Sequence, residues 1–152
     1  IFKVKKRSKL KPLPIFVKDI EMAIKLAEIS KEQEKILTLR LRSGQAKYWP
    51  GKYTFVLKRK LGIKLYGVAK DTIAIRIPKY KFLNNLLKKI NKPLVQTSVN
   101  ISSDLPLAKI SDIKAKFGEL KSKIIIIDAG NLKKAKPSTI IDLTSKHLTR
   151  LR

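Results

Sequence analysis

The chain has 152 residues, and its 36 Lys and Arg against 11 Asp and Glu give a formal net charge of +25 at pH 7. The absence of cysteine excludes disulfides, thiol nucleophiles, thiolate zinc sites and iron–sulfur clusters, and a single histidine, His147, excludes mechanisms that need a histidine pair. Hydrophobic residues make up 43 % of the chain, enough for a core, but no apolar run approaches the ~20 residues of a membrane span. We therefore expect a cytoplasmic protein with no membrane partner. Because the chain begins at Ile1, we expect a fragment or a processed product.

Apolar periodicity and turn signals predict strands and helices that alternate along the chain. The opening segment is expected to begin as a strand and to continue as a basic loop that leads to a second strand at residues 15–17. A helix is expected after Asp19, whose side chain is suited to capping it. Further helices are expected over residues 31–42 and 80–90 and from a Ser111 cap to Gly118. The later predicted strands are residues 15–17, 53–58, the region around Leu65, 72–77, 94–97, 124–128, 139–143 and 147–151.

The fold class follows from this mixture of elements. Residues 124–128 form a continuous apolar run, which is typical of a central strand buried on both faces. The chain shows no repeat, linker or low-complexity break. It is therefore predicted to form one α/β domain over residues 1–152, with a twisted mixed sheet flanked by helices.

The positive charge attracts polyanions such as RNA, DNA or nucleotides. It comes from 29 Lys and only 7 Arg. Recognition of base edges or phosphates favours arginine, whose planar fork makes two parallel hydrogen bonds. The lysines therefore fit either a nonspecific binding face or a coding bias, and the few arginines are more informative.

Two clusters of polar residues contain arginine. In an extended strand Lys3, Lys5 and Arg7 would share one face, which suggests a phosphate site or a solvated edge strand guarded by lysines. On the strand over residues 72–77, Thr72 and Arg76 face away from the isoleucines. An arginine on that face needs a carboxylate or phosphate, or forms an ordinary surface ion pair.

Two further clusters are rich in hydroxyl groups. The segment 96–104, with Thr97, Ser98 and Asn100, follows a short strand, at the end of the sheet where open α/β folds bind ligands. Ser138 and Thr139 open a strand directly after Pro137. A plain polar loop and a backbone cap are the alternatives.

Several kinds of site are absent from the sequence. It contains no GxxxxGK[ST] loop and no GxGxxG motif, which excludes a glycine-rich nucleotide cradle. No pair of carboxylates suggests acid–base catalysis, and no cluster of ligands suggests a transition metal. A site of Lys, Arg, Ser, Thr and Asn suits adenylyl transfer, in which orientation and electrostatics provide most of the catalysis.

Six motifs occur in an order that resembles the Sua5/YrdC/YciO family. They are IFKVKKR followed by KPL, then YWPGKYTFVL, DTIAIRIP, PLVQTSVN, IIDAG with KPSTIID, and LR at residues 151–152. They correspond to the family's K-x-R, W-P-G-P-x-T, R-x-P, T-S-A-N, P-S-T and L-R patterns, and the resemblance covers the whole chain.

The resemblance implies a YrdC-like fold with a basic concave face and the synthesis of threonylcarbamoyl-AMP. L-threonine, bicarbonate and ATP would give threonylcarbamoyl-AMP and pyrophosphate, with magnesium bound to the ATP. The product would serve the tRNA threonylcarbamoyl-transfer machinery, which modifies adenosine 37 of tRNA. RNA or tRNA is therefore a further expected partner.

The resemblance also implies roles for individual residues. The expected catalytic residues are Lys5, Arg7, Ser98 and Asn100. The expected ATP ligands are Lys3, Arg7, Thr72, Asn100 and Arg152. The expected threonine ligands are Arg76, Ser98 and Ser138, and no residue is expected to bind metal directly.

The chain departs from the family pattern at three points. A preceding segment with a P-T-D-T-x-Y-G-L motif is missing, so the domain is expected to be incomplete at its N-terminal side. Lys52 and Tyr53 stand where the family has P-x, and Val99 replaces an alanine. The alternative function is that of a noncatalytic, RNA-binding YrdC-like protein.

Overall fold

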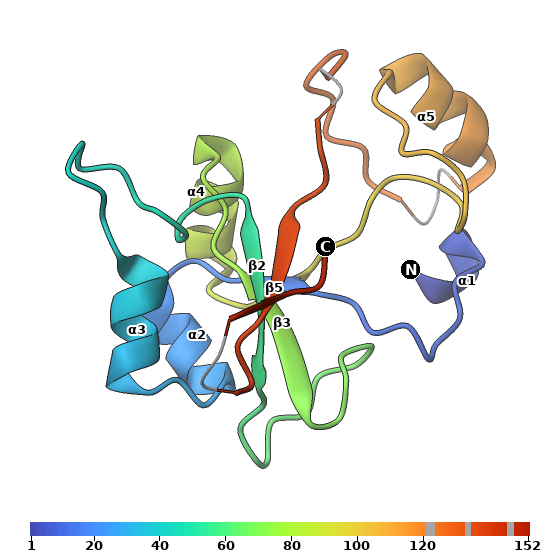
Figure 1. Ribbon diagram of the computed structural model, residues 1–152. Coiled ribbons are helices and arrows are strands. Elements are labelled where there is room, and N and C mark those ends of the chain that lie inside the picture. Colours follow the sequence, from blue (N-terminus) through green and yellow to red (C-terminus); the bar gives the residue numbers. More distant parts are fainter. Residues whose placement is uncertain (121–123, 133–134, 146–147) are drawn as a thin grey trace. The chain divides into compact units, whose positions relative to one another are not determined.

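Two units, each built from two stretches of the chain, make up the computed structural model, which describes residues 1–120, 124–132, 135–145 and 148–152 (Figure 1). The small unit consists of residues 1–11 and 97–137. The sheet unit consists of residues 12–96 and 138–152.

A mixed sheet is the centre of the sheet unit. Its described residues form six strands in the order β4-β1-β3-β2-β5-β6. Neighbours β1 and β3, and β2 and β5, run parallel, whereas the other neighbouring pairs are antiparallel. The strands are β1 (Ile15–Phe16), β2 (Tyr53–Lys58), β3 (Thr72–Arg76), β4 (Leu94–Val95), β5 (Thr139–Asp142) and β6 (Thr149–Arg150). The predicted α/β class with a mixed sheet is confirmed.

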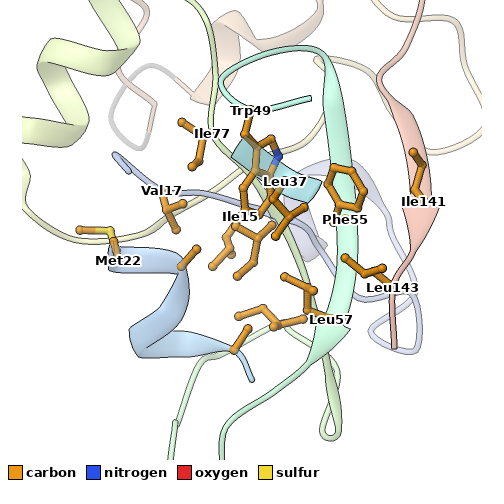
Figure 2. Packing of buried hydrophobic residues seen from close by; sticks show 14 residues of the cluster. Ile15, Val17, Met22, Leu37, Trp49, Phe55, Leu57, Ile77, Ile141 and Leu143 are labelled. Atoms are coloured by element: carbon orange, nitrogen blue, oxygen red, sulfur yellow. The ribbon is translucent and has the colours of Figure 1, made fainter. Parts of the chain in front are cut away.

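The core of the sheet unit lies on one face of this sheet. Phe55 in β2 pairs with Ile75 in β3 and with Ile141 in β5, and all three side chains are buried. Figure 2 shows Phe55 and Ile141 in this core. Helices α2 (Ile20–Leu26) and α3 (Lys31–Thr38) contribute Met22 and Leu37 to the same cluster. This face holds the strands in register, because a slip of one residue would turn every buried side chain outward.

Local capping defines where these two helices begin. The Asp19 carboxylate accepts a hydrogen bond of 2.8 Å from the backbone N–H of Met22, as the sequence predicts. At α3, Ser30 and Gln33 form a reciprocal capping box. A third helix of the sheet unit, α4 (Lys81–Ile90), matches the predicted helix over residues 80–90 and buries Leu87.

The opposite face of the sheet carries polar residues. Thr72 and Arg76 are half-buried and alternate along β3 with the buried Ile73 and Ile75. This confirms the predicted division of the strand into two faces, which follows from the two-residue period of a strand. The register places Thr54 of β2 on the polar face as well.

The opening segment is a helix, so the predicted strand there is wrong. Helix α1 (Phe2–Lys5) lies in the small unit, which also contains α5 (Ile110–Phe117) and the 3₁₀ turn η1 (Gly118–Leu120). The backbone N–H of Arg7 closes the turn on the carbonyl of Phe2 at 2.9 Å. Residues two apart on a helix differ by ~200° in direction, so Lys3 and Lys5 do not share a face. The helix directs the Lys5 side chain toward the loop that follows residue 97, where the side chain is buried and its ammonium group donates a hydrogen bond. The burial of this side chain therefore favours the helix.

The apolar run over residues 124–128 has no regular secondary structure, so the predicted central strand is also wrong. Ile125 is 92 % exposed and Ile127 is 61 % exposed. A central strand needs a hydrogen-bonded neighbour on each side. No strand among the described residues pairs with this run.

Two predictions in the sheet unit differ from the structure between the helices and strands. Helix α3 ends at Thr38 instead of residue 42, because the chain reverses at Gly44 and the N–H of Leu41 donates to the carbonyl of Gln45 at 2.8 Å. The region around Leu65 forms turns instead of a strand.

The remaining differences lie at the ends of predicted elements. Helix α5 begins at Ile110 with Lys109 as its N-cap, so Ser111 lies inside the helix and the predicted Ser111 cap is wrong. The C-cap of the helix is Gly118, where the helix is predicted to end. The last predicted strand is confirmed for Thr149–Arg150, and His147 lies outside the described residues. No helix in the part of the chain described here is long and apolar enough to span a membrane.

Candidate functional site

A hydrogen-bond network in the small unit joins three of the predicted site residues. The ammonium group of Lys5 donates to the carbonyl oxygens of Ser98 at 2.6 Å and of Asn100 at 2.7 Å, and also to the side-chain oxygen of Asn100. The Ser98 hydroxyl donates to that same side-chain oxygen at 2.8 Å. The Asn100 amide in turn donates to the carbonyl of Asp104 at 2.6 Å. The network therefore fixes the conformation of the loop over residues 98–104.

Lys5 is the centre of this network. It is 5 % exposed, and its three N–H donors match the three oxygens around it. Burial lowers the pKa of Lys5, and the nearby charge of Arg7 lowers it further. Lys5 is therefore a buried hydrogen-bond donor that holds Ser98 and Asn100 in place. The same three residues help to line a cavity of about 600 Å³ in the small unit, most of whose other lining residues are apolar.

The other two predicted basic residues of the small unit differ in their surroundings. Lys3 is exposed on α1. Arg7 is half-buried, and its Nε donates to the carbonyl of Lys11 at 3.1 Å.

In the sheet unit, Arg76 is held at the end of β3. Its Nε donates to the carbonyl of Gly51 at 2.8 Å, and its guanidinium lies 5.7 Å from the centre of the Phe16 ring. Burial lowers the pKa of Arg76 from its ordinary high value. The terminal guanidinium nitrogens make no hydrogen bond to the residues that the structure describes. A half-buried guanidinium with two nitrogens available suits a carboxylate that is bound through both oxygens.

The W-P-G turn supports this arginine. Trp49 is 2 % exposed, packs edge-on against Phe55 and donates its indole N–H to the carbonyl of Tyr53 at 3.0 Å. A Cβ atom at Gly51 would lie 2.4 Å from the carbonyl oxygen of Tyr48, so a side chain at this position would displace the turn. The core thus fixes the carbonyl that orients Arg76.

Ser138 lies next to the start of β5 and has two partners in the sheet unit. The buried Thr54 hydroxyl donates to the Ser138 hydroxyl at 3.1 Å. Arg152 donates from Nε to the Ser138 carbonyl at 3.3 Å. The structure thus brings together Ser138 and Arg152, which are 14 residues apart in sequence.

Thr72 lies at the other end of β3 from Arg76, opposite Lys58. Four residues of extended strand separate the two Cα atoms by ~13 Å. Thr72 therefore shares a sheet face with Arg76 without contacting it. Among the described residues there is no group of three or more His, Cys, Asp or Glu that could hold a metal ion.

The predicted site residues divide between the units. The small unit contains Lys3, Lys5, Arg7, Ser98 and Asn100, and the sheet unit contains Thr72, Arg76, Ser138 and Arg152. Sequence reasoning missed Thr54 and the contact between Gly51 and Arg76. Gly51 and Thr54 both lie in the YWPGKYT segment. The spacing of residues in that segment does not show which of its backbone and side-chain atoms contact other site residues.

Comparison with known proteins decides the family. The family model Sua5_yciO_yrdC, described as "Telomere recombination", matches residues 1–152. The chain belongs to the Sua5/YciO/YrdC family. A relative from Methanocaldococcus jannaschii named "Putative threonylcarbamoyl-AMP synthase" is 34 % identical over 152 residues, which are 100 % of this chain and 67 % of the relative.

Solved structures of the Sua5/YciO/YrdC family share the fold. Sua5 of P. abyssi complexed with L-threonine matches with a TM-score of 0.82 and 28 % identity over 99 % of this chain. The chain spans only 42 % of that protein. YciO of E. coli matches with a TM-score of 0.76 and 20 % identity over 100 % of this chain and 70 % of YciO, a likeness of fold alone.

Proposed function

We propose that this family member is a threonylcarbamoyl-AMP synthase. The amine of L-threonine and bicarbonate would form a carbamate with loss of water. A carbamate oxygen would then attack the α-phosphorus of ATP, and the bond to pyrophosphate would break. Magnesium enters as the Mg–ATP substrate. The threonylcarbamoyl-AMP formed would pass to the machinery that modifies adenosine 37 of tRNA.

The geometry of Arg76 is the observation that carries this proposal. Gly51 orients its guanidinium, and the terminal nitrogens make no bond within the described part of the chain. An amino-acid carboxylate is the ligand that this arrangement fits best. Two comparisons support the choice of threonine: the name of the relative from M. jannaschii, and the complex of P. abyssi Sua5 with L-threonine.

The small unit would act on ATP. Lys3 and Arg7 would neutralise phosphate charge, and Ser98 and Asn100 would contact the reacting groups. Lys5 has its donors occupied by the loop over residues 98–104, so we assign it a positioning role within the catalytic set. The further ATP ligands proposed are Thr72 and Arg152, and Ser138 would bind threonine together with Arg76.

Release of pyrophosphate tests this function. The 152-residue chain, incubated with Mg–ATP and bicarbonate, is expected to release pyrophosphate only when L-threonine is present. Arg76→Ala is expected to lower kcat/KM for threonine by about 100-fold or more, because a partly buried carboxylate loses its paired charge. Arg76→Lys keeps the charge but loses the two-pronged geometry, so it is expected to recover only part of the activity.

The matched control is Arg42→Ala, because Arg42 is an exposed arginine of the sheet unit. It removes the same charge and is expected to leave turnover unchanged. Thermal unfolding of each variant shows whether the sheet unit is intact. Full turnover in a folded Arg76→Ala protein would contradict the assignment of the threonine site.

Noncatalytic RNA binding is the second candidate, and the charge distribution favours it. Only three ion pairs occur among the described residues, and all three use lysine. Most of the basic side chains that the structure describes therefore have no carboxylate within ion-pair distance. A folded chain that released no pyrophosphate but bound RNA would support this candidate over the synthase.

A further inference from the structure

Thr54 is a polar side chain buried in the middle of the sheet. It is 0 % exposed, although it lies on the polar face and its neighbour Phe55 lies in the core. A buried hydroxyl without a partner destabilises the folded state, so such groups persist where they have a specific partner. The partner of Thr54 is the hydroxyl of Ser138, at 3.1 Å.

The register explains why these two hydroxyls meet. Thr54 pairs with Ile140 in the parallel ladder of β2 and β5. Ser138 is two residues before Ile140 and therefore points to the same face as Thr54. On the other side, the pairing of Phe55 with Ile75 continues by one residue to place Thr54 opposite Arg76. Thr54 thus lies on the strand between Arg76 and Ser138.

The hydrogen bond to Thr54 leaves the Ser138 hydroxyl able to bind a ligand. A hydroxyl can donate and accept at the same time, so when the Ser138 hydroxyl donates to a bound carboxylate, its oxygen can still accept the proton of Thr54, 3.1 Å away. The Arg152 side chain holds the Ser138 carbonyl and restrains the backbone at the same residue. Ser138 is half-buried, so part of this residue is open to solvent.

We infer that Thr54 is a positioning residue that aims the Ser138 hydroxyl at the carboxylate of L-threonine. This inference rests on the proposed function. Two strand spacings, ~10 Å, separate the backbones of β3 and β5, a distance that an extended arginine and a bound amino acid cover together. Arg76 supplies the charge, Ser138 supplies a neutral donor, and Thr54 fixes the rotamer of that donor without touching the substrate.

Substitutions at Thr54 separate its hydroxyl from its volume. Thr54→Val keeps the shape and removes the donor, whereas Thr54→Ser keeps the donor and removes a methyl group. With Thr54→Val, KM for L-threonine is expected to rise about three- to tenfold, the equivalent of one hydrogen bond, while kcat and KM for ATP stay within about twofold. Thr54→Ser is expected to restore KM to within about twofold of the parent chain. Calorimetric titration with L-threonine provides the matching affinities.

A double-mutant cycle tests whether Thr54 acts through Ser138. In a Ser138→Ala background, Thr54→Val is expected to cause no further rise in KM. Additive effects would overturn the inference, as would equal losses from Thr54→Ser and Thr54→Val, which indicate packing alone. A Thr54→Val protein with the KM of the parent chain would overturn it and leave the synthase intact. If the parent chain neither binds L-threonine nor releases pyrophosphate, the proposed function itself fails and the inference fails with it.

Discussion

At the scale of single residues, Lys5 is a buried cation that holds a loop of the candidate site in place. Its ammonium group lies among three oxygens of the loop over residues 98–104, and its own carbonyl accepts a hydrogen bond of 2.8 Å from the N–H of Ser102. A phosphate would have to compete with these three oxygens for the same donors. The loop, and not the solvent, therefore determines where this charge lies.

The lowered pKa of Lys5 predicts a pH-dependent stability. Burial, and then the charge of Arg7, place the pKa of folded Lys5 below the value in the unfolded chain. Between the two values the unfolded chain binds more protons, so the free energy of unfolding rises as the pH rises through this window. Lys5→Met removes this dependence and leaves three oxygens without their donor, which is expected to cost about 1–3 kcal/mol.

Urea unfolding of the parent chain and of Lys5→Met, measured in steps from pH 7 to pH 10, tests this expectation. The stability difference in favour of the parent chain is expected to grow with pH. Lys3→Met is the matched control, because Lys3 is exposed on the same helix. A difference that shrinks with pH would contradict the direction of the Lys5 shift.

At the scale of elements, patterns that depend on neighbours in sequence were predictable. The alternation over residues 72–77 gave the two faces of β3 correctly, because side-chain direction in a strand repeats every two residues. The Asp19 cap was also predictable, because a capping residue is adjacent in sequence to the helix that it caps. The helical conformation of residues 2–5 was not predictable, because the burial of Lys5 depends on a loop more than 90 residues away in sequence.

Residues 124–128 show a second limit of sequence patterns. An apolar run indicates burial but does not show which strands are available to cover it. The site shows the same limit: the sequence singled out Arg76 and Ser138, but not Thr54 between them. Only the pairing of β2 with β3 and β5 reveals that position.

The exposure of Ile125 leads to a stability prediction. Because this side chain is 92 % exposed, Ile125→Lys is expected to change the free energy of unfolding by less than about 0.5 kcal/mol. Phe117 belongs to the same unit and is 7 % exposed, so Phe117→Ala is expected to cost about 3–5 kcal/mol. Urea unfolding of both variants compares the two positions. A loss of several kcal/mol with Ile125→Lys would indicate that the run is a buried strand after all.

At the scale of the whole molecule, the net charge of +25 dominates long-range interactions. Lysines without carboxylate partners attract polyanions through counterion release, which is sensitive to salt and largely insensitive to sequence. We therefore expect RNA to bind with an affinity that falls at least tenfold between 50 and 200 mM salt, whichever proposed function holds. Fluorescence anisotropy with two unrelated RNA sequences measures both properties. Binding that is independent of salt would show that the charge does not drive it.

The way in which the chain divides between its units has a consequence for synthesis on the ribosome. The sheet unit begins at residue 12, but β5 and β6 come from residues 138–152. A nascent chain that has emerged only as far as Gln96 has made β2 and β3 but lacks the strand that flanks β2 on its other side. The Thr54 hydroxyl therefore lacks its hydrogen-bond partner until residues 97–137 have been translated and Ser138 has been added to the chain. Vectorial synthesis makes the completion of this sheet a late event.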